Sequence, residues 1–158
     1  MRVAELDDVD RAIIDALQVD GRTPYSRLGP AVGLSQAAVR QRVQRLVESG
    51  VMQVVAVTDP AVLGLGLQAM VGLNASGDLR TIADKVAARD DCDYVVVTAG
   101  RYDLLVEVVA ADTDALLELV NDGLRGIPGV TGAEVLTYLS LVKQTYSWGA
   151  RGPATPGR

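Results

Sequence analysis

The side chains best suited to chemistry in this sequence are the arginines and glutamines between residues 21 and 47. Five arginines occur there without a single acidic residue. An arginine can bind phosphate or bond guanine through two hydrogen bonds, and a glutamine can bond adenine in the same way. The candidate contact residues are Arg22, Ser35, Gln36, Ala37, Arg40, Gln41, Gln44 and Arg45. Their types and spacing predict a surface that binds double-stranded DNA.

The charge of the chain is unevenly distributed around this surface. The 158 residues carry a net charge of −5. Residues 1–50 hold seven basic and seven acidic side chains, whereas residues 51–158 hold eight basic and thirteen acidic ones. A local excess of positive charge on an acidic protein can face phosphates. The alternative is a solvated face whose arginines pair with acids of the preceding helix, and for Arg42 this is at least as good an interpretation.

Several kinds of chemistry are excluded by missing residue types. The sequence has no histidine, so it lacks histidine metal sites, imidazole acid–base catalysis and histidine-based triads. Cys92 is the only cysteine, and its acidic neighbours Asp90, Asp91 and Asp93 disfavour a thiolate. The carboxylates of residues 51–158 are scattered, which is typical of a solubilising surface. We therefore expect no enzyme, no cofactor and no metal site.

No segment predicts secretion or a membrane span. The first eight residues are acidic and lack an apolar core, unlike a signal peptide. The longest charge-free stretch, Pro60 to Gly77, contains a proline and four glycines, whereas a membrane helix needs about 20 mostly apolar residues. A single cysteine permits no internal disulfide, which is typical of a reducing compartment. We expect a cytoplasmic protein without a membrane partner.

Residues 1–50 carry the start and stop signals of three short helices. The first begins after an aspartate capping pattern at Asp7 and ends at Gly21. The second is expected to be capped by Thr23, with Pro24 in its first helical position. Ser35 caps the third. Three helices of this kind form a helix-turn-helix unit, which lays its last helix in the major groove of DNA.

The third helix has one apolar and one polar face. Val39, Val43 and Leu46 recur at helical spacing and predict a buried stripe. On a wheel of 100° per residue, the side chains pointing away from the stripe are Ala37, Gln41 and Gln44, with Arg40 and Arg45 on the flanks. The polar face is therefore the one expected to read base edges.

One local rule is broken in the second helix. Pro30 falls inside it, where a proline removes a hydrogen bond at a cost of about 3 kcal/mol. Gly29 weakens the same turn. We expect a kink or an early end there, and the sequence gives no reason why the pair is tolerated.

The remaining residues alternate between strand and helix patterns. The valine-rich segment Val51–Thr58 predicts a linker strand, followed by a hinge. The later strands are expected at Leu67–Leu73, Tyr94–Thr98, Asp103–Ala110 and Val130–Lys143, with helices capped by Asp78 and Thr113. This βαββαβ order is that of a ferredoxin-like α+β domain, an antiparallel sheet with both helices on one face.

The expected fold leaves the second face of the sheet uncovered. A second copy of the chain is the available cover, so we expect a homodimer. The expected organisation is a helix-turn-helix domain over residues 1–50, a linker strand and hinge over 51–65, the βαββαβ domain over 66–146 and a mobile tail over 147–158.

Several motifs follow one another in order over roughly residues 5–145. The first is Leu6-Asp7-x-x-Asp10-x-x-Ile13-Ile14-x-x-Leu17, followed by Asp20-Gly21-Arg22. The later ones are Gly33-Leu34-Ser35, Arg42, Arg45-Leu46, Gly50-Val51, Gly100-Arg101-Tyr102-Asp103, Pro128-Gly129-Val130 and Lys143. In order and spacing they resemble the Lrp/AsnC (feast/famine) family of bacterial and archaeal transcription regulators.

The resemblance implies an architecture and partners. Members of the family join a winged-type helix-turn-helix to a sensor domain of ACT/RAM-like βαββαβ fold. They pair through their sheets and often assemble into rings of dimers, such as octamers. Amino acids or related small molecules commonly bind between dimers. The resemblance therefore implies double-stranded DNA, a small-molecule effector and further copies of the chain as partners.

The resemblance also points to effector contacts. The candidate residues are Gly100, Tyr102, Asp103 and Val135. The first three belong to the turn that resembles the family's Gly-x-x-Asp motif. Val135, like Ala133, stands where members often have a threonine, and the missing hydroxyls bear on which effector fits. The alternatives are local: an aspartate after a turn can cap N–H groups, and Gly100 can be required for a positive φ.

Together these features predict a sequence-specific DNA-binding transcriptional regulator whose assembly or DNA affinity responds to an amino acid or a related small molecule. Two alternatives stay open. One is an architectural DNA-binding protein without an effector, and the other is a small-molecule sensor that uses its helical unit for protein docking. Salt-dependent affinity for duplex DNA would separate the docking module from both DNA-binding interpretations.

Overall fold

The structure is a computed structural model that describes residues 6–144. The chain divides into two compact units: among the described residues, the first comprises those up to Ala56 together with Lys143 and Gln144, and the second spans Val57–Val142. The tail predicted for residues 147–158 lies outside the described residues. None of the described helices is long and apolar enough to cross a lipid bilayer.

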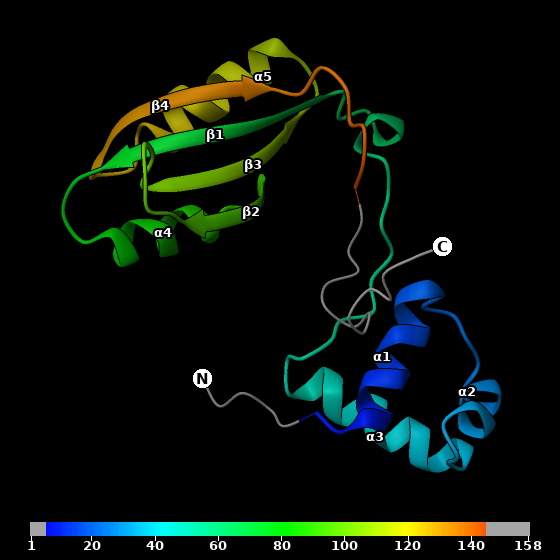
Figure 1. The fold of residues 1–158 in the computed structure, drawn as a ribbon. Helices are drawn as coiled ribbons and strands as arrows, with labels where there is room; N and C mark the ends of the chain where they lie inside the picture. The colour runs from blue at the N-terminus through cyan, green and yellow to red at the C-terminus, as the bar shows by residue number, and fades with distance from the viewer. Residues whose placement is uncertain (1–5, 145–158) are drawn as a thin grey trace, which may run out of the picture. The chain divides into compact units, whose positions relative to one another are not determined.

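The first unit contains the three predicted helices, α1 (Asp8–Val19), α2 (Tyr25–Ala31) and α3 (Gln36–Glu48) (Figure 1). Asp7 caps α1 in a reciprocal box, since its side chain accepts from the backbone N–H of Asp10 and the Asp10 side chain accepts in return. Ser35 caps α3 as predicted, because its hydroxyl accepts from the N–H of Ala38. The start signals of α1 and α3 are therefore confirmed.

The helices of this unit enclose a small apolar core. The predicted stripe of α3 is buried, with Val39 fully inaccessible. The buried apolar residues are Ile13, Leu17, Leu28, Val39, Val43 and Leu46. One face of α3 is thereby committed to the interior, and its opposite face is left exposed.

The start of α2 differs from the prediction. Thr23 does not cap the helix, because its hydroxyl donates to the carbonyl oxygen of Asp20 at 2.8 Å. Pro24 stands at the cap position without a side-chain hydrogen bond, and the helix begins at Tyr25. The threonine closes the turn after α1 instead of opening α2.

The Gly29-Pro30 pair has a structural explanation. Because α2 ends at Ala31, Pro30 lies in its last turn and its missing N–H removes a single hydrogen bond. A Cβ at Gly29 would lie 2.6 Å from the carbonyl oxygen of Leu34, which follows the turn. The N–H of Leu34 also donates to the carbonyl of Gly29 at 2.8 Å. The glycine lets the backbone entering α3 approach α2 closely.

The strand predicted over Val51–Thr58 is not formed. Residues 52–59 have no regular secondary structure, and the short 3-10 helix η1 (Pro60–Leu63) follows them. A strand requires a hydrogen-bonded partner, and these residues pair with no strand in the described part of the chain. Valine content alone was therefore a misleading signal here.

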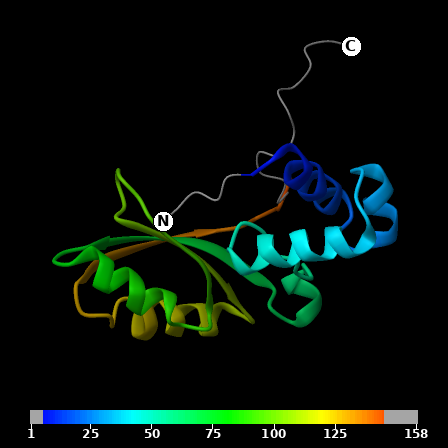
Figure 2. The ribbon, with the colours of Figure 1, turned by 90° about the horizontal axis from the view of Figure 1, so that it is seen from below.

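The second unit is a four-stranded antiparallel sheet with strand order β2-β3-β1-β4. Its elements are β1 (Leu67–Ala75), α4 (Leu79–Ala87), β2 (Cys92–Val97), β3 (Leu104–Ala110), α5 (Thr113–Glu118), the π-helix η2 (Leu119–Leu124) and β4 (Val130–Thr137). Both α4 and α5 lie on one side of the sheet (Figure 2). This confirms the ferredoxin-like α+β domain.

Two local predictions in this unit were wrong. Asp112, not Thr113, caps α5, because its carboxylate accepts from the N–H of Ala115 at 2.9 Å. The last strand ends at Thr137 instead of Lys143, because its ladder with β1 stops at the pair Ala69–Thr137 and is followed only by a bond from the N–H of Tyr138 to the carbonyl oxygen of Gln68 at 2.8 Å.

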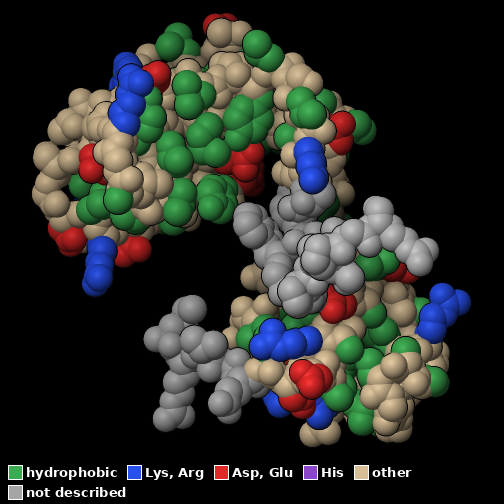
Figure 3. All heavy atoms as spheres, in the orientation of Figure 1, with side chains coloured by type: hydrophobic (Ala, Val, Ile, Leu, Met, Phe, Trp, Pro, Cys, Tyr) green, Lys and Arg blue, Asp and Glu red, His purple; other side chains and the backbone are tan. Residues whose placement is uncertain are grey.

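The sheet has one buried and one open face. Along β3, Leu104, Val106 and Val108 are fully buried against the helices, and the residues between them are half-buried. The alternation places Met70, Leu105, Val109 and Leu136 on the face without helices. Hydrophobic side chains gather over the sheet in Figure 3. The uncovered face predicted from the sequence is therefore present, and part of it is apolar.

We expect Gly29→Ala to destabilise the first unit by about 1–3 kcal/mol, the cost of forcing extra volume into a packed site. Helix propensity alone would favour alanine by about 1 kcal/mol, so a loss of stability isolates the clash with Leu34. Thermal unfolding followed by circular dichroism measures the change. Gly21→Ala is the control, because its Cβ would meet nothing closer than 3.7 Å. Equal stability of the two variants would contradict the close approach.

Candidate nucleic-acid interface

The exposed face of α3 brings together most of the predicted DNA contacts. Ser35, at the start of the helix, and the side chains that follow it line a shallow surface hollow of about 510 Å³. The lining residues are Ser35, Gln36, Ala37, Arg40, Gln41 and Gln44. All six are exposed, and Arg40 makes no ion pair within the described residues. Arg22 lies apart from them, in the turn between α1 and α2.

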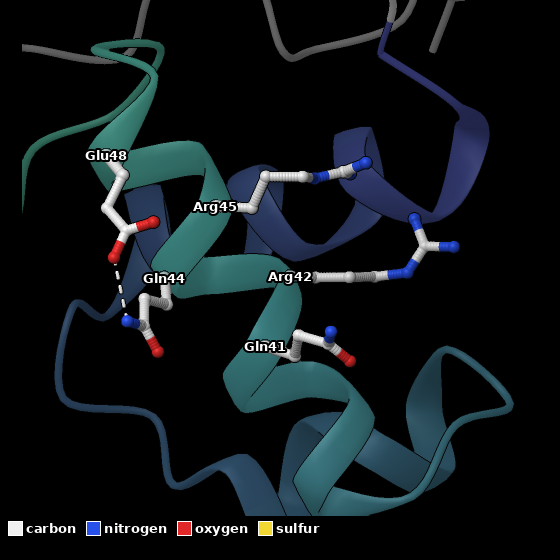
Figure 4. A pocket seen from close by; sticks show the side chains of 5 residues that line it. All are labelled: Gln41, Arg42, Gln44, Arg45 and Glu48. Carbon is white, nitrogen blue, oxygen red and sulfur yellow. Dashed lines mark hydrogen bonds between the residues drawn. The ribbon is translucent and has the colours of Figure 1, made fainter.

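A second hollow of about 550 Å³ continues along the same helix. It is lined by Gln41, Arg42, Gln44, Arg45 and Glu48 (Figure 4). The amide nitrogen of Gln44 donates to the carboxylate of Glu48 at 2.7 Å, one turn further on. The sequence reasoning did not single out Glu48, although the spacing of four residues on a helix is a known signal for such a pair.

Arg42 and Arg45 are both tied to the first turn of α1. Arg42 donates to the carboxylates of Asp7 at 2.6 Å and Asp10 at 2.8 Å. One terminal nitrogen of Arg45 donates to both carboxylate oxygens of Asp10, at 2.7 and 2.6 Å. Figure 4 shows the two arginines extending in the same direction from α3. We call these four side chains the Asp–Arg cluster. The expected pairing of Arg42 with acids of the first helix is confirmed, and Arg45 also pairs with one of these acids.

The Asp–Arg cluster places a carboxylate inside the helical unit. Asp10 is 1% exposed, whereas Arg42 and Arg45 keep 28% and 58% of their side chains exposed. A buried carboxylate is tolerated only when hydrogen bonds replace its lost hydration. Both arginines and the backbone N–H of Asp7 provide these bonds. The cluster therefore fixes the C-terminal half of α3 against the beginning of α1.

The charges of the cluster stabilise one another. The hydrogen bond from Arg42 lowers the pKa of the Asp7 carboxyl below its usual value, and the backbone N–H of Asp10 adds to this. Reciprocally, the hydrogen bonds to Asp7 and then to Asp10 raise the pKa of Arg42. Two acids and two arginines make the cluster neutral, so Arg40 is the arginine of α3 that the cluster leaves out.

In the second unit, the turn between β2 and β3 contains three of the predicted effector residues. Gly100 has a φ of +152°, which a residue with a side chain rarely adopts, so the predicted backbone requirement is confirmed. The carboxylate of Asp103 accepts from the N–H of Ala75 in β1 at 2.8 Å. That bond ties the turn to the neighbouring strand. It is the local structural role that the sequence offered as the alternative to ligand binding by Asp103.

Tyr102 lies on the open face of the sheet. A Cβ at Gly72 would lie 2.7 Å from the ring, so the ring packs directly on the backbone of β1. The hydroxyl of Tyr102 donates to the carboxylate of Glu134 in β4, and this bond raises the tyrosine pKa. Arg101 pairs with the same carboxylate at 2.8 Å. Neither Gly72 nor Glu134 could be found without the strand register that aligns them.

Val135 is separated from these residues within one chain. It pairs with the buried Val71 and so points to the helix-covered face, whereas Glu134 and Tyr102 belong to the opposite one. Ala133 points the same way as Val135. One chain thus brings together Gly100, Tyr102 and Asp103 but not Val135.

Cys92 is a weak nucleophile in this environment. Burial and the neighbouring Asp91 raise the pKa of its thiol to about 11. A thiol with such a pKa carries almost no thiolate at neutral pH. The residue is half-buried at the start of β2, where it packs against the sheet core.

Comparisons with known proteins match both units. The AsnC-type helix-turn-helix domain matches residues 6–47, and the Lrp/AsnC ligand binding domain matches residues 68–148. The HTH-type transcriptional regulator AldR of Mycolicibacterium smegmatis is 37% identical over 139 residues, which cover 85% of this chain and 81% of that protein.

Two solved structures are similar over nearly the whole chain. The leucine response regulatory protein LrpA of Mycobacterium tuberculosis has a TM-score of 0.82 at 27% identity, covering 90% of this chain and 98% of that one. The transcriptional regulator NMB0573 of Neisseria meningitidis, solved as a complex with L-Met, has a TM-score of 0.79 at 28% identity. The match covers 92% of this chain and 97% of that one.

The Asp–Arg cluster predicts a pH dependence. Since the folded-state pKa of Asp7 is lowered, its ionisation adds stability above the unfolded pKa of about 3.9, and this stability is lost as the pH falls through the folded pKa. In Arg42→Gln, we expect the Asp7 pKa to rise back toward an ordinary aspartate, measured by carbon-13 NMR titration of the carboxyl. The rise is partial, because the N–H of Asp10 remains. An unchanged pKa would contradict the ion pair.

Proposed function

Because the chain belongs to the Lrp/AsnC family of transcriptional regulators, we propose that it binds duplex DNA through the exposed face of α3 and responds to a small molecule bound at its sheet domain. Membership of the family makes it a regulator with a helix-turn-helix and a ligand-binding domain, not an enzyme. The residues, the effector and the assembly proposed below go beyond that membership.

The main observation in support of DNA binding is that α3 has one buried apolar side and one exposed polar side. Its apolar stripe is buried, and the opposite side presents amides and an arginine without an ion-pair partner among the described residues. In our proposal Gln36, Gln41 and Gln44 meet base edges, and Arg40 bonds guanine or an adjacent phosphate. Ala37 allows the helix to approach closely. Ser35 and Arg22 contact phosphates and set the register of the helix.

The position of Arg45 on the flank of the polar face suggested that it reads bases, but in our proposal it contacts a phosphate. Its guanidinium is 58% exposed, yet one terminal nitrogen is held by Asp10. Its remaining donors can touch a phosphate at the edge of the interface. We therefore assign it a positioning contact and leave base reading to Arg40 and the glutamines.

A homodimer is the assembly we propose. The open face of the sheet carries Met70, Leu105, Val109 and Leu136, and neither α4 nor α5, the helices packed on this sheet, covers it. A self-complementary pairing of two such faces follows the usual two-fold rule for homodimers. Two copies of α3 would then read half-sites about one helical turn (~34 Å), or a multiple of it, apart. Assembly of dimers into octamers is part of the same proposal.

The effector site is proposed at the turn between β2 and β3. Arg101 and Glu134 present opposite charges beside Tyr102, which suits the carboxylate and ammonium groups of an amino acid. The L-Met complex of the similar regulator NMB0573 supports an amino acid as the class of effector. Gly100 allows close approach of a ligand, and Asp103 holds the turn in place. Val135 lies on the other face of the same sheet, so it joins the site only from a second copy.

We expect Arg40→Ala to weaken binding to a preferred duplex by roughly 1–3 kcal/mol and to relax the preference at one base position. The measurement is fluorescence anisotropy on a duplex selected from a randomised pool, with each position of the site then varied. Arg80→Ala removes the same charge from an exposed position of α4 in the sheet unit and serves as the control. Unchanged affinity and unchanged preference for Arg40→Ala would remove Arg40 from the reading set.

We also expect one of the amino acids to raise the melting temperature of the wild-type chain in a thermal-shift screen. A ligand at 100 times its dissociation constant adds about 2.7 kcal/mol of stability. Tyr102→Phe should reduce the shift, because it removes the hydroxyl bonded to Glu134. Tyr94→Phe, at an exposed tyrosine of β2, should leave it intact. No shift with any amino acid at saturation would favour the effector-free architectural protein.

A further inference from the structure

The Asp–Arg cluster lies on the helix that the proposed function assigns to DNA, and it neutralises part of that helix. Two of the three arginines of α3, Arg42 and Arg45, donate to carboxylates of α1. Arg42 and Arg45 line the same hollow as Gln41 and Gln44, so they are within the surface that a duplex would cover. Their charges would otherwise be available to the phosphate backbone.

We infer that Asp7 and Asp10 determine DNA specificity by competing with phosphate for Arg42 and for the one terminal nitrogen of Arg45 that Asp10 holds, while the remaining donors of Arg45 stay free for an edge contact. Phosphate contacts made by arginine act on every sequence alike and supply most non-specific affinity. A carboxylate of the same chain that occupies such an arginine lowers binding to all sequences. Base contacts made elsewhere on the helix are untouched, and the ratio of specific to non-specific affinity therefore rises. This inference rests on the proposed docking of α3 in duplex DNA.

The two carboxylates divide this role by their burial. Asp10 is 1% exposed and its bonds to both arginines also hold α1 against α3, so its removal would disturb the unit itself. Asp7 is 52% exposed and reaches Arg42 from the rim of the cluster. Its second oxygen accepts from the N–H of Asp10 and caps α1. Asp7 is therefore the position at which the charge can be removed with the least structural change.

The substitution Asp7→Asn separates competition from capping. Asparagine caps helices about as well as aspartate, so the bond to the Asp10 N–H is retained. The amide carries no charge, however, so Arg42 keeps only its bond to Asp10 and its guanidinium is held less strongly away from phosphate. Asp8→Asn is the matched control, because Asp8 is exposed in the same turn, makes no ion pair within the described residues and changes the net charge equally.

The experiment measures the affinity of both variants for a duplex of random sequence, about two helical turns long, and for a duplex selected by the wild-type chain. Salt is varied from about 50 to about 200 mM. One added phosphate contact steepens the log–log salt slope by about 0.9, which is roughly a 3.5-fold change in relative affinity over this range. We expect this change for Asp7→Asn relative to Asp8→Asn on the random duplex, together with a smaller specific-to-random ratio.

Adding Arg42→Gln to Asp7→Asn should return the salt slope to that of the control, since the released arginine is gone. Thermal unfolding of the three variants checks that α1 and α3 remain folded. Equal slopes for Asp7→Asn and Asp8→Asn would overturn the inference while leaving DNA binding by α3 intact. A loss of specific affinity without any gain on the random duplex would also overturn it, because Asp7 would then orient Arg42 for a contact. Failure of the wild-type chain to bind any duplex would contradict the proposed function itself.

Discussion

The burial of Val39, Val43 and Leu46 is the constraint on which the DNA-binding surface depends. Fully burying an aliphatic side chain contributes about 1.5–3 kcal/mol, so the stripe contributes roughly 5–9 kcal/mol in total. A single base contact is worth about 1–3 kcal/mol, which is too little to rotate α3 and expose that stripe. The side chains on the outer face are therefore set before any duplex arrives. The Asp–Arg cluster then fixes the remaining freedom of the helix by joining its second half to α1.

Burial of one face also fixes the opposite face in the sheet unit, where side chains alternate every two residues instead of every 3.6 as on a helix. Burial of alternate residues of β1 and β3 against the helices sends Gly72, Leu105 and their neighbours to the open face. Because Gly72 has no side chain, the Tyr102 ring can lie on β1 and reach Glu134 in β4. The candidate effector turn and the proposed dimer surface thus lie on one face of the sheet. In our proposal the two would be coupled by contact, since a ligand at the turn would lie beside a second copy.

The sequence predicted the features that depend on local patterns. The caps at Asp7 and Ser35, the buried stripe of α3 and the βαββαβ order all follow from spacing along the chain. The errors occurred where the local structure depends on contacts that the local sequence pattern does not show. Val51–Thr58 has strand composition but no partner strand in the described chain, and Thr23 bonds back to Asp20 instead of forward into α2. The pairing of Arg45 with Asp10 spans 35 residues, and the separation of Val135 from Tyr102 needs the strand register.

The central claim is that α3 presents its arginine and glutamines to the grooves and phosphates of duplex DNA. Equilibrium binding of the wild-type chain to a labelled duplex, titrated with salt, tests it most directly. We predict that the logarithm of the association constant falls linearly with the logarithm of salt concentration, with a slope of about 0.9 for each phosphate contact. Binding that is absent even in dilute buffer, or that does not change with salt, would contradict it.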